Sequence, residues 1–446
     1  MRKLLWIAAF VLGFSTSAQA GLQQASFKNG VKLIVEEDHS APVAMVQVWL
    51  KVGGRDEVPG KTGLAHVFEH MMFKGSKKLE AGEYSKIISA MGGSDNAFTS
   101  TDYTAYFETV PAAEVNRVLK MEAERFAHLK LRDKDFQSEI KVIMEERRMR
   151  TEDDANSRMF EELSAASLRL HPYRNPVIGW MQDLEALTID DVKAFYKKHY
   201  VPANVTVVVV GDVDFHQVKK VVAKTFGKMK ARKVEPRFNP TEPEPLGAKR
   251  VVVELPAQLP MVAFTLPVPS WLPGKNDKEA AALALATEIL AGGKSAVLNR
   301  VLVNEKRSAA AAGAGYDPFT MGLDLWYAYG ALGVGQSTAS FEADFWALID
   351  KMGKTLPDER RFAAAKRSLI ANAVFAQDSL YLRAKHIGIL ETVGIGSMQQ
   401  DKWLDLIRAV QPEDVRDAIA RWLQPNRATT GILQPQQAKV MQGAQQ

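Results

Sequence analysis

The order of apolar and polar positions along the chain predicts short strands and longer amphipathic helices. Apolar residues alternate with polar ones, or run together, in three short stretches that are predicted to be strands: 32–36, 43–52 and 104–110. Apolar residues recur every three or four positions in three longer stretches that are predicted to be helices: 81–91, 112–128 and 134–150. Strands and helices do not alternate strictly. The pattern therefore favours an α+β fold in which helices pack on mainly antiparallel sheets.

The two halves of the chain carry the same succession of elements, which indicates a diverged internal repeat. In each half a strand precedes a helix near the start, and a helix, a proline and an apolar strand follow near the end. The corresponding segments are 43–52 and 261–268, 63–73 and 278–290, 191–202 and 414–425, and 205–210 and 428–433. We therefore expect two homologous domains. The alternative is that two unrelated α/β domains share commonplace patterns.

Residues 229–249 form the clearest boundary in the chain. They combine four prolines with many charged side chains, which predicts an extended linker. The predicted first domain is therefore 21–228, and the predicted second domain is 250–446.

The first 20 residues resemble a Sec-type signal peptide. Arg2 and Lys3 form a charged start, an apolar centre follows, and Ala18-Gln19-Ala20 forms a cleavage site. The apolar centre is too short to cross a membrane, and no later stretch is long enough either. We therefore expect cleavage after Ala20 and a periplasmic or secreted protein without a stable membrane anchor. The alternative is a buried N-terminal helix.

Composition narrows the possible chemistry. The chain has no cysteine, which excludes thiol catalysis and thiolate metal ligands, so any metal site must use histidine and carboxylate groups. The formal charge is +5, and it becomes +3 when the signal peptide removes two basic residues. Such a mild charge gives no reason to expect nucleic-acid binding.

The segment His66-Val67-Phe68-Glu69-His70 carries the strongest chemical signal. Two histidines four positions apart on a helix lie on the same side, where their imidazoles can share one metal ion. Glu69 is close enough to act on a water at that ion. The order His-x-x-Glu-His marks the inverted zinc peptidases. The alternative is a pair of helix-surface histidines beside a chance glutamate.

A glutamate-rich helix is the predicted source of a third ligand. Glu139 and Glu146 are seven positions apart and share one helix face, whereas Glu145 is rotated by about 100° from Glu146. Two carboxylates on one face can supply one metal ligand and one acceptor that orients a histidine. The alternative is an ordinary solvated helix face.

Taken together, these motifs resemble those of the insulinase/pitrilysin-type zinc peptidases, particularly the short bacterial members that look like mitochondrial processing peptidase. The resemblance spans essentially the whole mature chain. It implies that His66, His70 and Glu146 bind one Zn²⁺ ion, that Glu69 is catalytic and that Glu139 is an outer-shell acid.

The resemblance also implies how a peptide is held. Residues 92–100 resemble the family's substrate-side loop and edge strand, so Asn96, Ala97, Phe98 and Thr99 are predicted to bind substrate. The two halves would form half of a clamshell, and a second pair would close it. Ordinary turn chemistry is the alternative for Asn96 and Thr99.

The second half departs from the family pattern. Active members usually carry an arginine and a tyrosine seven residues apart, where this chain has Asn304 and Ala311. Tyr316 is a doubtful substitute. We therefore expect the zinc-bearing subunit of a heterodimer, whose homologous partner supplies the missing pair. The alternatives are weak activity of the chain alone, a non-catalytic assembly or chaperone-like subunit, and a zinc-storage or zinc-delivery protein.

Overall fold

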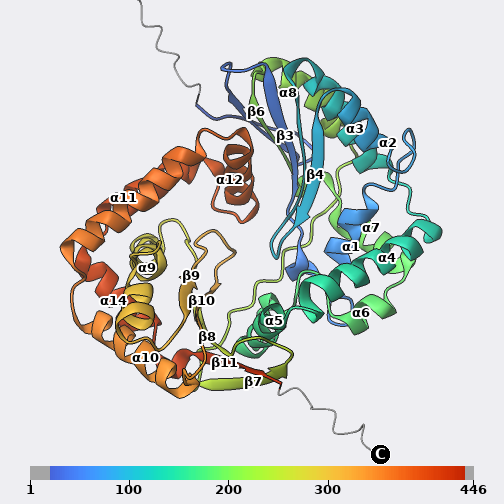
Figure 1. Ribbon diagram of the computed structural model, residues 1–446. Coiled ribbons are helices and arrows are strands. Elements are labelled where there is room, and N and C mark those ends of the chain that lie inside the picture. Colours follow the sequence, from blue (N-terminus) through green and yellow to red (C-terminus); the bar gives the residue numbers. More distant parts are fainter. Residues whose placement is uncertain (1–20, 437–446) are drawn as a thin grey trace, which may run out of the picture.

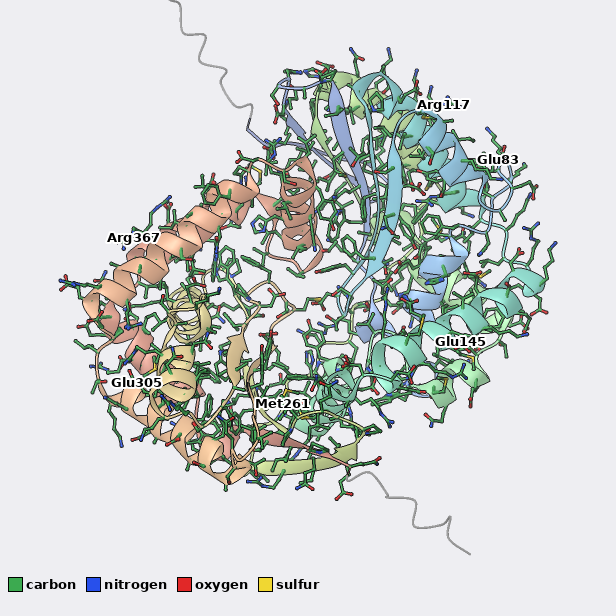
Figure 2. The ribbon with its side chains drawn as sticks, in the orientation of Figure 1. Glu83, Arg117, Glu145, Met261, Glu305 and Arg367 are labelled. Atoms are coloured by element: carbon green, nitrogen blue, oxygen red, sulfur yellow. The ribbon has the colours of Figure 1, made fainter. Side chains whose placement is uncertain are left out.

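The computed structural model describes residues 21–436, so the predicted signal peptide lies outside the described residues. These residues form two sheets, each flanked by helices, which Figure 1 shows as two units at the upper right and lower left of the molecule. Charged side chains such as Glu83, Arg117 and Arg367 point outward from this arrangement, whereas Met261 lies inside it (Figure 2). The α+β class predicted from the sequence is confirmed.

The first sheet has six strands in the order β1-β2-β6-β3-β5-β4. Only β2 and β6 pair in parallel, and every other neighbouring pair is antiparallel. The strands are β1 (Gln23–Ser26), β2 (Lys32–Glu37), β3 (Val43–Leu50), β4 (Ser94–Thr99), β5 (Thr104–Pro111) and β6 (Val205–Gly211).

The second sheet has five strands in the order β7-β11-β8-β10-β9. Its one parallel pair is β7 with β11. The strands are β7 (Lys249–Leu255), β8 (Met261–Val268), β9 (Ala311–Gly315), β10 (Asp324–Ala331) and β11 (Thr429–Pro435).

The two sheets share one topology. The series β2-β6-β3-β5-β4 in the first sheet corresponds to β7-β11-β8-β10-β9 in the second, with the parallel pair in the same place. This agreement confirms the predicted internal repeat. Strand β1 is an additional edge strand of the first sheet. The edge strands β4 and β9 occupy equivalent positions.

Helices cover both sheets. The first half contains α1 (Leu64–Met71), α2 (Glu83–Ala90), α3 (Val115–His128), α4 (Asp133–Arg147), α5 (Ala155–Ser167), α6 (Met181–Ala186), α7 (Ile189–His199) and α8 (Phe215–Lys224). The second half contains α9 (Asp277–Ala291), α10 (Thr338–Lys354), α11 (Glu359–Ala376), α12 (Leu380–Thr392), α13 (Gln400–Ala409) and α14 (Pro412–Trp422). Two π-helical turns occur at Arg148–Glu152 and Asn299–Glu305. Short 3₁₀ turns occur at Gly54–Asp56, Ala112–Glu114, Pro172–Arg174, Pro202–Asn204, Phe226–Lys228, Ser397–Gln399 and Pro425–Arg427.

Several predicted boundaries shift by a few residues, each for a local reason. Helix α2 begins at Glu83 because Gly82 has a left-handed φ of 73°. The strand predicted to reach residue 52 ends at Leu50, where its pairing with β5 and β6 stops. The helix predicted to reach residue 150 is α-helical only to Arg147 and continues as a π-helical turn.

Each half contributes one helix to the other half's sheet. Helix α5 packs on β7, β8 and β11, where Met159 and Leu163 join Met261 and Leu433 in a buried cluster. Helix α12 packs on β3 and β6 of the first sheet. The Cα of Gly388 in α12 comes so close to Trp49 that a Cβ there would lie 2.0 Å from the indole ring. The two halves are thereby interlocked.

Candidate metal centre

Helix α1 carries the two histidines of the motif, and its start is held by Glu57 in the preceding loop. Gly63 precedes the helix with a φ of 89°, and a Cβ at Gly63 would lie 2.8 Å from the carbonyl oxygen of Ile178. The carboxylate of Glu57 accepts hydrogen bonds from the N–H groups of Gly63 (2.8 Å) and Ala65 (2.7 Å). These two N–H groups belong to the helix start, which has no partner within the helix for them. Glu57 therefore acts as the cap of α1.

The sequence of α1 divides the helix into two faces. Leu64, Val67, Phe68 and Met71 are buried in the core beneath the first sheet. His66, Glu69 and His70 lie on the side that faces α4 and the edge strand β4. The apolar face packs into the core and holds the helix in place, and the other face carries His66, Glu69 and His70.

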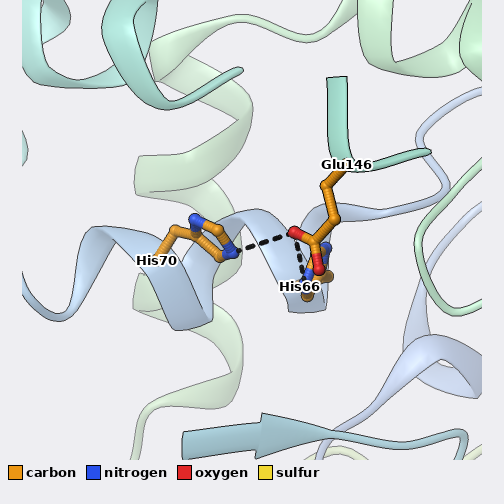
Figure 3. Close-up of side chains that lie close together, drawn as sticks. All are labelled: His66, His70 and Glu146. Carbon is orange, nitrogen blue, oxygen red and sulfur yellow. Dashed lines mark ion pairs between the residues drawn. The ribbon is translucent and has the colours of Figure 1, made fainter. Parts of the chain in front are cut away.

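The structure brings His66, His70 and Glu146 together. One ligand atom from each lies within 4.8 Å of those of the other two. Oε2 of Glu146 is 3.8 Å from Nε2 of His66 and 3.6 Å from Nε2 of His70 (Figure 3). Ligand atoms around a tetrahedral zinc ion are separated by roughly 3.4 Å. The three side chains therefore fit a zinc ion after only a small contraction.

Glu139 fixes the tautomer of His70. Nδ1 of His70 lies 3.2 Å from Oε2 of Glu139, and a carboxylate can only accept a hydrogen bond, so Nδ1 carries the proton. Nε2, the atom that faces Glu146, is then left with a free lone pair. The ammonium of Lys74 binds the other oxygen of Glu139 at 2.6 Å and completes the chain of contacts.

His66 is held in its neutral form by its surroundings. Burial, together with the nearby His70 and Arg150, lowers the pKa of His66 to about 3. A neutral imidazole is the form that binds a metal ion. The guanidinium of Arg150 pairs with Oε1 of Glu146 at 2.6 Å and leaves Oε2 toward the histidines. Glu145, by contrast, is exposed and pairs with Arg148, as its predicted rotation implies (Figure 2 labels Glu145).

Glu69 lies between the histidines and the edge strand. Burial raises the pKa of Glu69, and a hydrogen bond from the hydroxyl of Thr99 (2.5 Å) acts in the opposite direction. A carboxylate with a raised pKa accepts a proton more readily at neutral pH, which suits a general base.

The segment expected to bind substrate forms β4, the outermost strand of its sheet. One side of β4 pairs with β5, with Asn96 opposite Phe107 and Phe98 opposite Ala105. Ala97 is partly buried on the side of the sheet that carries α1. Phe98 packs on the opposite side, where its ring centroid lies 5.5 Å from that of Trp49. Thr99 connects the end of this strand directly to Glu69. An edge strand offers N–H and C=O groups to a further strand.

The second half contributes no equivalent of the missing arginine and tyrosine at the aligned positions. Asn304 is exposed within a π-helical turn, and Ala311 is exposed at the start of β9. The hydroxyl of Tyr316 donates to the carbonyl of Pro269 at 2.7 Å within its own domain. The hydroxyl of Tyr316 is therefore engaged within its own domain.

Three contacts of the site were missed in the sequence. Thr99 was singled out only as a substrate residue, and its bond to Glu69 was not anticipated. Lys74 lies four positions after His70, a spacing that could have drawn attention to it. Glu57 carries no such signal, because a loop residue that caps a helix from outside has no characteristic spacing.

Comparisons with known proteins agree with this geometry. Residues 32–180 match the family model described as Insulinase (Peptidase family M16), and residues 186–369 match the model described as Peptidase M16 inactive domain. A zinc protease of Helicobacter pylori, PqqE, is 35% identical over 322 residues, which cover 70% of this chain and 72% of that protein.

Two solved structures share the fold. A protease from Helicobacter pylori matches with a TM-score of 0.87 and 28% identity, covering 93% of this chain and 99% of that one. The periplasmic protease PqqL from Escherichia coli matches with a TM-score of 0.76 and 16% identity, covering 93% of this chain but 48% of the longer one.

Proposed function

The chain belongs to the insulinase family, peptidase family M16, and from this membership we propose that it is an exported, zinc-dependent endopeptidase. Its substrates would be short or unfolded peptides held in a closed chamber. The observation that carries the proposal is the convergence of His66, His70 and Glu146 within 4.8 Å beside Glu69. One zinc ion per chain would be bound by these three ligands, and Glu139 would orient His70.

The protein groups divide the work of peptide hydrolysis between them. A zinc ion at this site would act as a Lewis acid and would lower the pKa of a water molecule. Glu69 takes the proton of the attacking water and passes it to the nitrogen of the leaving amine. Thr99 holds one oxygen of Glu69 and so orients the carboxylate toward the end of β4. Neutral His66 and the Nδ1-protonated His70 present lone pairs to the metal.

The free edge of β4 is the proposed place for the substrate backbone. A peptide that adds as a strand beside Asn96, Ala97 and Phe98 would run toward Thr99 and hence toward Glu69. Backbone pairing is tolerant of sequence, so the size of the chamber, and not a strict recognition motif, would limit the substrates.

We propose that a homologous partner completes the site. Asn304 and Ala311 offer neither a cation nor a phenol where the family pattern has an arginine and a tyrosine. Losing one donor that is directed at a developing oxyanion commonly costs about 10²–10³ in rate. The match to about half the length of PqqL supports an arrangement of two such units.

Export to the periplasm or beyond is part of the same proposal. It rests on the signal-peptide pattern of residues 1–20. Within residues 21–436, none of the helices has the length and apolar character needed to span a bilayer.

A second candidate function is a non-catalytic assembly subunit. It is favoured by the match of residues 186–369 to a model described as an inactive domain, together with Asn304 and Ala311. The intact set of His66, His70, Glu146 and Glu69 argues against it. A metal assay separates the two, since an assembly subunit has no need to bind zinc.

The deciding experiment is cleavage of a quenched fluorescent peptide by the zinc-loaded mature chain, with Glu69→Gln as the blank. The substitution keeps the ligands and removes the base, so zinc content should be unchanged while turnover is lost. Substantial cleavage by the Gln variant would contradict the role of Glu69. If the wild type binds zinc but is inactive alone, adding the homologous partner should restore turnover.

A further inference from the structure

A second cavity lies outside the metal centre, on the linker side of the first domain. It has a volume of about 760 Å³. Its lining includes residues 55–60, 198–199 and, from the linker, 234–238, together with Arg169, Leu170, Pro172, Arg174 and Asn175. The residues that line it include none of the three candidate zinc ligands. It does include Glu57, the cap of α1.

The linker wall of this cavity is fixed by ion pairs. The guanidinium of Arg237 binds the carboxylate of Asp56 at 2.6 and 2.9 Å and donates to the carbonyl of Asp102 at 2.8 Å. Arg55 donates to the carbonyl of Phe238 at 2.8 Å and to Oδ1 of the next residue at 2.7 Å. The predicted extended linker therefore forms one wall of the cavity.

The acidic side chains around the cavity already have partners. Asp56 pairs with Arg237, Glu57 caps α1, and Asp183 accepts from the hydroxyl (2.6 Å) and N–H (3.0 Å) of Thr62. Glu235 lies 3.7 Å from a lysine of the linker. Asp56 is paired with a cation of the cavity, whereas Glu57 and Asp183 are hydrogen-bonded to neutral donors. The lining still holds an excess of positive charge, with six lysines and arginines and four aspartates and glutamates.

The cationic side chains around the cavity, in contrast, are mostly unbalanced. Lys51, Arg169 and Lys198 form no ion pair with any residue in the range 21–436, and Arg174 donates only to the carbonyl of Arg169. Lys51 is partly buried; burial lowers its pKa, the nearby carboxylate of Glu391 raises it, and the cations Lys32 and Arg237 lower it. Burial of an ammonium group is unfavourable. Glu391 offsets part of this cost for Lys51, and an anion in the cavity would offset more of it.

Apolar surface accompanies these charges. Val58, Leu170 and Phe238 line the cavity with exposed fractions of 47%, 58% and 68%, and Trp180 adds an aromatic ring. Exposed apolar side chains beside convergent polar groups are typical of small-molecule sites. Apolar walls together with unpaired cations favour a ligand that has both an apolar part and a negative charge.

We propose that this cavity binds a small organic anion, with a carboxylate or phosphate group held by Lys51 and Arg174 and an apolar part packed against Leu170 and Phe238. The site is separate from the zinc centre and does not depend on the proposed peptidase activity. Its neighbour Glu57 connects it to the start of α1.

The test is isothermal titration calorimetry of the zinc-loaded mature chain with phenyl phosphate, benzoate and inorganic phosphate. We expect saturable binding of at least one aromatic anion, tighter than that of inorganic phosphate. Phenyl phosphate and benzoate distinguish the two possible charged groups. Lys51→Met and Arg174→Gln should each weaken binding by about tenfold, because hydrogen bonds between ionised groups are the stronger class.

Lys120→Gln is the matched control, since Lys120 lines a different, lysine-rich surface pocket. Arg174 is exposed, so its variant should fold even if Lys51→Met does not. Equal weakening by Lys120→Gln would mean general surface attraction and would overturn the proposal. Binding that disappears on zinc removal but survives Lys51→Met would place the anion on the metal and would overturn it as well.

Discussion

Glu57 offers the sharpest test of how the fold positions the metal centre. Its carboxylate accepts two N–H groups at the start of α1, at 2.8 and 2.7 Å, and no side chain within the helix replaces it. The helix carries His66, Glu69 and His70 one to two turns further on. We therefore expect Glu57→Gln to loosen α1 and to weaken zinc binding without touching the metal.

The size of the destabilisation of α1 follows from the two hydrogen bonds that Glu57 accepts. The Gln side chain keeps one acceptor and turns an NH₂ group toward the other backbone N–H, which loses its partner. Losing a hydrogen bond to a charged acceptor costs about 1.5–3 kcal/mol, and an N-cap substitution costs about 0.5–2 kcal/mol. Burial raises the pKa of Glu57, and the N–H donors of Gly63 and Ala65 lower it. If the carboxyl group is partly protonated, the free-energy cost of the substitution lies at the lower end of these ranges. We expect Glu57→Gln to lower the free energy of local opening of α1 by about 1–3 kcal/mol, which raises the opening equilibrium constant roughly 5- to 150-fold.

Hydrogen exchange read out by mass spectrometry measures this opening directly. Peptides from residues 64–71 should exchange faster by that factor, and chelator competition should show weaker zinc binding. Global unfolding is less suitable, because a chain with two interlocked units need not unfold in one step. Glu83→Gln is the matched control: Glu83 stands at the exposed start of α2 and accepts the N–H of Glu80 at 2.8 Å.

The two variants separate positioning from a general charge effect. If Glu57→Gln leaves both the exchange of residues 64–71 and the zinc affinity unchanged, the cap does not hold the site. If Glu83→Gln changes them equally, the effect arises from total charge. Either result would refute the reasoning.

Three further predictions concern the surroundings of the site. Glu139→Gln should weaken zinc binding by about 10–100-fold in chelator competition, because it removes the group that fixes the tautomer of His70; unchanged affinity would contradict this. Gly388→Ala should lower the melting temperature, since its Cβ would meet Trp49 at 2.0 Å and overpacking costs about 1–3 kcal/mol; Trp49→Phe should recover part of the loss. Burial raises the pKa of Glu108 well above its usual 4.5, so the folded state holds a proton that the unfolded chain releases. Stability should therefore fall as pH rises from about 4.5 toward the folded pKa, and Glu108→Gln should remove this slope from melting curves recorded between about pH 5 and pH 9; parallel slopes would contradict it.

The residues that gather at the site were predictable because their spacing is local. His66 and His70 are one turn apart on one helix, and Glu139 and Glu146 are two turns apart on another, so helical geometry alone puts each pair on one face. Residue spacing along the sequence does not show that these two helices lie side by side. That expectation came from the family resemblance, and the structure brings the pairs together. Their roles in binding metal remain predictions.

Contacts between distant segments could not be predicted in the same way. An amphipathic pattern shows that α5 and α12 each have an apolar face, but it does not name the sheet that covers it. Each helix in fact packs on the sheet of the other half. The cap from Glu57 could not be predicted either, because loop residues carry no periodicity.

The contrast between α1 and α9 concerns the single candidate metal centre found among residues 21–436. Both helices follow the equivalent strands β3 and β8. Helix α9 is rich in buried alanine and leucine, contacts α11, α13 and α14, and carries no histidine. Helix α1 buries only one face and leaves the other toward α4 and β4. A helix that is apolar all round must be buried, whereas one with a free face can carry chemistry. The two sheets therefore place α1 and α9 at equivalent positions, and of the two helices α1 carries the histidines of the candidate site.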